Sequence, residues 1–145
     1  MTAVELLFIC EGHTEQNFVS TVLRPHLRPL RVFAKPERLG GIVKHGTLSK
    51  AIADELGRSR QHQYVTTMID LYGLPADFPG KAREGNESGA QRATRIEAGM
   101  SRALPHPRFI PYVQVHEFEA LVLVDPDRLS DQFPDGEAVG LPLKL

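Results

Sequence analysis

The segment from Val4 to Thr14 constrains the fold more than any other part of the chain. Its first seven residues, VELLFIC, form a nearly continuous apolar run, which stops at Glu11-Gly12. A run of this kind is typical of a strand that is buried on both faces of a parallel sheet. Ligands of open α/β sheets bind outside the carboxyl ends of the strands, so Glu11 is a candidate site residue. The alternative is that Glu11 is a solvated loop acid.

A helix is expected directly after this strand. Gly12 permits a sharp turn, and Thr14 is a suitable N-cap, with Glu15 in the first turn behind it. The helical pattern continues through Leu23, and the prolines at positions 25 and 29 should end or kink it.

The rest of the chain continues the alternation of strands and helices. Leu71 to Gly85 is rich in glycine and proline and predicts a long irregular excursion across the carboxyl-end face of the sheet. The pattern predicts an α/β fold, a single domain over residues 1–135 with a four-stranded, mainly parallel sheet flanked by helices, and an irregular or truncated tail at 136–145. The remaining expected elements are a strand at 31–34 closed by Pro36, a helix capped by Thr47 or Ser49 and ending near Arg58, a strand at 64–69, a helix at 88–104, and a strand at 109–115 made irregular by Pro111.

Composition limits the setting and the partners. The 145 residues fit one domain, and the formal net charge of −1 gives no global attraction for a polyanion. Cys10 is the only cysteine, at the end of an apolar strand, so we expect a buried side chain and a reduced, cytoplasmic setting. No apolar run approaches the roughly 20 residues of a membrane span. We therefore expect no membrane association.

Acids follow three of the expected strands. Glu11 follows the first, Asp70 ends the segment YVTTMI, and Glu117 and Glu119 follow the last. Parallel strands would bring these acids to one edge of the sheet, where carboxylate oxygens suit Mg²⁺ or Mn²⁺. The sequence therefore predicts a metal site that activates water for phosphodiester cleavage. The neighbouring His13 and His116 are candidates for proton transfer or metal binding, or plain hydrogen-bonding residues.

Three motifs together carry a resemblance to a known family. These are Glu11-Gly12-x-Thr14-Glu15, then Met68 to Gly73 (MIDLYG), then His116 to Ala120 (HEFEA). In that order the chain resembles a bacterial family of the Toprim-like group, domain of unknown function 4276. The resemblance implies a compact α/β fold with a four-stranded parallel sheet.

The resemblance also implies roles for individual residues. The glutamate after the first Toprim strand matches Glu11, and the first aspartate of the Asp-x-Asp motif matches Asp70. The second aspartate would fall at Tyr72, so one metal ligand is missing unless Glu117, Glu119 or Asp77 replaces it. Tyr72 is expected to pack within its loop; the alternatives are that it stacks on a base or serves as a nucleophile.

We therefore expect a Mg²⁺- or Mn²⁺-dependent nuclease or phosphodiesterase in the bacterial cytoplasm, acting on nucleic acid. One alternative is a catalytically weak binding module that acts with an ATPase encoded nearby. Another is a nucleotide- or phosphate-binding domain that uses the turn at Gly12 and the helix start at Thr14. The arginines of the third helix are expected either on a solvated face or in contact with phosphate or a partner protein; they are Arg92, Arg95 and Arg102.

Overall fold

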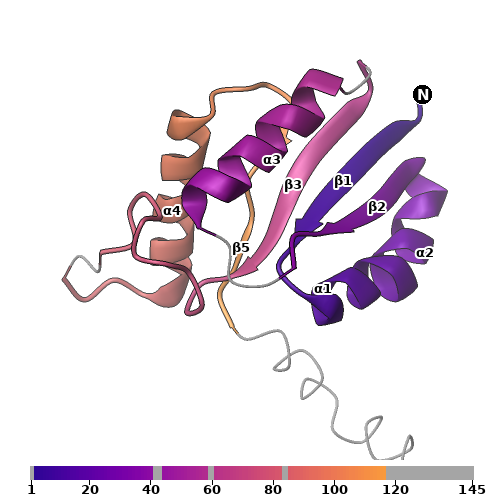
Figure 1. Ribbon diagram of the computed structural model, residues 1–145. Helices are drawn as coiled ribbons and strands as arrows, with labels where there is room; N and C mark the ends of the chain where they lie inside the picture. Colours follow the sequence, from indigo (N-terminus) through magenta and orange to yellow (C-terminus); the bar gives the residue numbers. More distant parts are fainter. Residues whose placement is uncertain (1, 41–43, 59–60, 83–84, 117–145) are drawn as a thin grey trace, which may run out of the picture.

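The computed structural model describes residues 2–40, 44–58, 61–82 and 85–116 (Figure 1). Its strands are β1 (Val4–Cys10), β2 (Val32–Arg38), β3 (Gln63–Asp70), β4 (Phe109–Ile110) and β5 (Val113–Gln114). Its helical elements are α1 (His13–Phe18), the π-helical η1 (Val19–Leu23), α2 (Arg24–Leu27), the 3₁₀ turn η2 (Arg28–Leu30), α3 (His45–Arg58) and α4 (Gly89–Ala103).

The strands form one parallel arrangement in the order β2-β1-β3-β4, with β5 also paired with β3. Val4 lies opposite Val32 on one side of β1, and Glu5 lies opposite Gln63 on the other. Because all pairings are parallel, the carboxyl ends of β1, β2, β3 and β5 lie toward one edge of the sheet. The predicted α/β fold is confirmed.

Side chains of β1 alternate between two apolar cores, as a doubly covered strand requires. Leu7 and Ile9 belong to a cluster with residues of α3 and α4. Phe8 and Cys10 belong to a second cluster with Val19 of η1. Helices α3 and α4 thus cover one face of the sheet, and the region α1–α2 packs against the other. The two-sided burial predicted for the first strand is confirmed.

The first helical region differs from expectation at its start and in its middle. Gly12, not Thr14, is the N-cap, and the Glu15 carboxylate accepts a hydrogen bond from the Gly12 N–H at 2.9 Å. Thr14 is exposed within the first turn. The helix also widens into the π-helical η1 before Pro25, which lies in the first turn of α2, where its missing N–H costs little.

Strand β2 continues past Pro36 to Arg38, so the expectation that Pro36 closes it is wrong. The reason is its position at the edge of the sheet. An edge strand needs ladder hydrogen bonds on one side only, so a proline can be accommodated. The extension carries Arg38 to the carboxyl-end edge of the sheet.

The last predicted strand is present as two short strands, β4 and β5, separated by Pro111 and Tyr112. Thr67 of β3 fills this interruption with its hydroxyl group, which donates to the Tyr112 carbonyl at 2.7 Å and accepts from the Tyr112 N–H at 2.9 Å. The irregularity predicted from Pro111 is confirmed.

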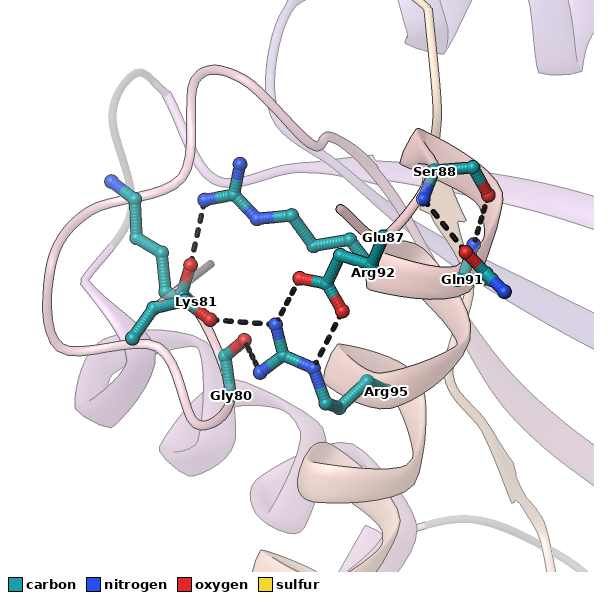
Figure 2. Close-up of polar contacts among 8 residues, drawn as sticks. Gly80, Lys81, Glu87, Ser88, Gln91, Arg92 and Arg95 are labelled. Carbon is teal, nitrogen blue, oxygen red and sulfur yellow. Dashed lines mark hydrogen bonds and ion pairs between the residues drawn. The ribbon is translucent and has the colours of Figure 1, made fainter. Parts of the chain in front are cut away.

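The helix predicted over 88–104 is confirmed as α4, with Ser88 as the N-cap. Two of its arginines hold the preceding excursion in place (Figure 2). Arg95 donates to the carbonyls of Gly80 and Ala82 and to both carboxylate oxygens of Glu87, and Arg92 donates to the Lys81 carbonyl at 2.6 Å.

The prediction for these arginines is therefore corrected: only Arg102 is exposed on the helix surface. Arg92 and Arg95 bind backbone carbonyls of their own chain because the irregular segment leaves these acceptors without partners in a helix or sheet.

Candidate functional site

Glu11 and Asp70 meet at the carboxyl ends of the two central strands. The Glu11 N–H donates to the Met68 carbonyl at 3.3 Å, which continues the pairing of β1 with β3 by one residue. The Asp70 N–H then donates to Oε2 of Glu11 at 3.4 Å. Both side chains are half-buried, and Oδ1 of Asp70 is inaccessible to solvent. The adjacency predicted for these two strand ends is thus present; that their carboxylates share one cation stays a prediction.

Gly73 borders the other oxygen of Glu11. A Cβ atom placed on Gly73 would lie 3.7 Å from Oε1 of Glu11 and 3.8 Å from the Asp70 carbonyl oxygen. Because glycine has no side chain, the turn after β3 passes close to the Glu11 carboxylate. Oε2 of Glu11 accepts from the Asp70 N–H, and Oε1 lies on the side of Gly73.

The surroundings of Glu11 favour its protonated form. Burial raises the pKa of the Glu11 carboxyl group, the hydrogen bond from the Asp70 N–H lowers it, and the negative charge of Glu15 raises it further. Glu15 is only 8% exposed and belongs to α1. The net pKa shift is upward, which is the direction expected of a carboxyl group that exchanges protons near neutral pH.

A basic pair lies at the same edge of the sheet. A guanidinium nitrogen of Arg38, the last residue of β2, lies 2.7 Å from Nε2 of His13, the first residue of α1. Both side chains are exposed. Since a guanidinium group can only donate, the His13 ring accepts through this nitrogen. Arg38 therefore carries the positive charge of the pair, and His13 lies two residues after Glu11 in the sequence.

Tyr72 occupies the position where the resemblance places a second aspartate. Its side chain is 62% exposed, so the expectation that it packs within the loop is wrong. The turn that follows β3 directs it away from the cores, which take Leu71 and Leu74 instead. Exposed aromatic rings can stack on a base or pack against a partner protein.

The last motif is described only up to its histidine. His116 is exposed, two residues beyond Gln114, which pairs with Asp70 in the sheet. Glu117 and Glu119 lie outside the described residues. The chain therefore leaves the described region from the strand next to Asp70, and the predicted contribution of the two glutamates stays a prediction.

The described residues include two of the carboxylates that the sequence predicts as metal ligands, Glu11 and Asp70. No group of three His, Cys, Asp or Glu side chains that would hold a metal ion occurs within them. Mg²⁺ is commonly bound through one or two carboxylates together with water and substrate phosphates, so Glu11 and Asp70 fit such an ion. Asp77 is engaged elsewhere: its carboxylate accepts from the His45 N–H at 2.9 Å at the start of α3.

Cys10 is a core residue, as predicted. Its side chain is fully buried, and burial, reinforced by the charge of Glu15, raises the pKa of the thiol to about 12. A thiol with this pKa carries almost no thiolate at neutral pH and does not serve as a nucleophile.

Sequence reasoning missed Arg38 as a residue of the site. Because the second strand was expected to end at Pro36, its last residue, Arg38, was not predicted to lie at the carboxyl-end edge of the sheet. The segment Glu37-Arg38-Leu39 contains no glycine or proline before Gly40, so the sequence was compatible with a strand that extends past Pro36.

Comparisons with known proteins place the chain in a family. No helix in the described ranges is long and apolar enough to cross a membrane. Neither a curated protein nor a solved structure matches the chain. Residues 10–140 match the family model described as Domain of unknown function (DUF4276), a range that contains all three motifs. Since this match covers most of the sequence, the chain belongs to the DUF4276 family.

Proposed function

We propose that this chain is a Mg²⁺- or Mn²⁺-dependent phosphodiesterase of the Toprim type that cleaves nucleic acid. The observation that carries the proposal is the hydrogen bond from the Asp70 N–H to the half-buried Glu11 carboxylate, at the carboxyl ends of neighbouring parallel strands. Ligand sites of open α/β sheets lie at such a place. The order of the three motifs supports the assignment to the Toprim-like group.

Asp70, together with Glu117 or Glu119, would hold the ion, and Glu11 would act as a further ligand or as the general acid/base beside it. When bound, the ion supplies Lewis-acid stabilisation of the phosphoryl oxygens and a water molecule of lowered pKa. Oε2 of Glu11 is anchored by the Asp70 N–H, so Oε1 is the atom that would exchange a proton with the attacking water or the leaving oxygen. The raised pKa of Glu11 supports this role.

The net charge of −1 gives no global attraction for nucleic acid. Binding of substrate phosphate would therefore depend on local positive charge near the site. Arg38 supplies this local positive charge at the rim, and both Arg38 and His13 are exposed to an incoming strand. Tyr72 offers an exposed ring on which a base would stack.

The second candidate is a binding module that acts with an ATPase encoded nearby. It is favoured by the tyrosine at position 72, where the Asp-x-Asp motif would have a metal ligand. A site that only binds phosphate at the start of α1 has less support, because the Glu15 carboxylate already accepts from the Gly12 N–H. An anion at that helix start would meet a negative charge.

The test is nicking of supercoiled plasmid DNA and of single-stranded RNA by the purified chain with Mn²⁺. We expect Asp70→Asn to lower the rate by at least about 100-fold, because metal-assisted stabilisation of the transition state is worth several kcal/mol. Asp54→Asn is the matched control, since Asp54 is an exposed acid of α3 in an ion pair with Lys50. Circular dichroism should show the same fold in all three proteins.

If the isolated chain is silent, the assay is repeated with the neighbouring ATPase, where the genome encodes one. Cleavage by the complex that is lost with Asp70→Asn supports the proposal. Tight complex formation with equal behaviour of wild type and Asp70→Asn would assign the chain to the binding modules instead.

A further inference from the structure

The second face of the sheet is only partly covered by the described residues. The region α1–α2 packs over β1 and β2, whereas a groove of about 520 Å³ remains beside it, over β3, β4 and β5. The groove is lined mainly by apolar side chains. The large apolar and aromatic side chains of this lining include Phe8, Phe18, Leu23, Met68, Ile110 and Tyr112.

The groove is suited to an apolar occupant. Within the described residues, Ile110 of β4 is 51% exposed, and Tyr112, between β4 and β5, is 41% exposed. The acidic side chain that lines the groove is Glu97, and its Oε1 already accepts a hydrogen bond from the Val113 N–H at 2.9 Å. Covering such a surface stabilises a protein by roughly 25 cal/mol per Å² of apolar area.

The path of the chain indicates which segment covers the groove. Gln114 of β5 lines the groove, and two residues later the described chain ends at His116. The other face of the sheet is already covered by α3 and α4. The second face is therefore the one available for the segment after β5.

The sequence of that segment matches the groove in character. Leu121 to Val124 reads LVLV and is an uninterrupted apolar run. The five residue-to-residue steps from His116 to Leu121 span up to roughly 17 Å when extended, which is enough to reach a groove that β5 itself lines. The family match continues to residue 140, so the run belongs to the same domain as the sheet.

We propose that Leu121 to Val124 of the same chain occupies this groove and completes the second layer of the fold. Glu117 and Glu119 precede the run, so its docking would fix them near the edge that carries Asp70. The inference does not depend on the catalytic proposal and is tested without an activity assay.

The first measurement is the melting temperature of the full chain with Ile110→Asp. If the groove is filled, this change buries a charge among apolar side chains, and we expect a decrease of about 10 °C. Leu30→Asp is the control, because Leu30 is 61% exposed at the end of the first helical region; its melting temperature should change by less than about 2 °C.

The second measurement is disulfide trapping in the full chain. Ile110→Cys is combined in turn with cysteine at each position from 121 to 124, and Leu30→Cys replaces Ile110→Cys in the control series. The buried Cys10 stays in place. We expect an intramolecular disulfide in at least one of the four proteins and in none of the controls. Disulfide-linked dimers that increase with protein concentration would show that a second copy fills the groove, and absence of a disulfide in all four would equally overturn the proposal.

Discussion

Arg95 should be the residue of α4 on which the excursion after β3 depends most. It is 21% exposed, and its guanidinium group contacts Gly80, Ala82 and Glu87, whose side chain is 12% exposed (Figure 2). Hydrogen bonds to charged groups contribute roughly 1.5–3 kcal/mol each in the net balance, but contacts that share one guanidinium group do not add. Solvent access at this partly exposed pair reduces the total further. We therefore expect Arg95→Met to lower the free energy of unfolding by about 3 kcal/mol.

The assay is chemical denaturation followed by circular dichroism, together with limited proteolysis. A loss of about 3 kcal/mol lowers the melting temperature by roughly 6–12 °C in a domain of this size, and cleavage should become faster between residues 71 and 88. Arg102→Met is the matched control, because Arg102 is exposed on the same helix. Arg95→Lys should restore only part of the stability, since an ammonium group cannot bond two carboxylate oxygens and two carbonyls in one plane. Equal stability of Arg95→Met and Arg102→Met would refute the reasoning.

Two further predictions concern the site and the packing of the excursion. A pKa that is raised in the folded state means that the protonated Glu11 carboxyl group contributes stability below its ordinary pKa, and that this contribution is lost as the pH rises through the folded value. Glu11→Gln should therefore melt at a higher temperature than wild type at pH 7 in EDTA and at the same temperature near pH 4. Added Mn²⁺ should raise the melting temperature of wild type much more than that of the variant. A lower melting temperature of the variant at pH 7 in EDTA would contradict this. Gly99→Ala should lower the melting temperature, because the new Cβ would lie 3.0 Å from Cβ and 3.1 Å from the carbonyl oxygen of Pro79; the control is Gly57→Ala, where the added Cβ has no neighbour within 4 Å among the described residues.

Local sequence patterns predicted the strands and helices that are defined by the spacing of their apolar residues and by the burial of those residues. The apolar run VELLFIC predicted a strand with two buried faces, and β1 contributes Leu7 and Ile9 to one core and Phe8 and Cys10 to the other. The same logic predicted β3 with an acid at its end. Parallel pairing then brought Glu11 and Asp70 together, a contact between residues that are 59 positions apart.

Other features depend on tertiary context that a single sequence does not reveal. The rule that proline ends a strand failed at Pro36, because only the strand order shows that β2 lies at an edge. The role of Arg95 was not predictable either, since its acceptors are backbone carbonyls in an irregular segment, and carbonyls have no sequence signature. Thr14 has good N-cap chemistry, but the chain begins its helix earlier, where Glu15 satisfies the Gly12 N–H.

The contacts of the excursion bear directly on the candidate site. The segment begins immediately after Asp70, and its turn places Gly73 beside Oε1 of Glu11. Farther along, Asp77 binds the start of α3, and Arg95 attaches the segment to α4. Gly73 lies between the end of β3 and the attachment at Asp77, and residues between two fixed points lose conformational freedom. The contact of Asp77 with α3 therefore restricts the position of Gly73 relative to Glu11 in addition to the turn itself. Pre-organisation of this kind lowers the cost of holding a reacting group in position, because the segment is already ordered before a ligand binds.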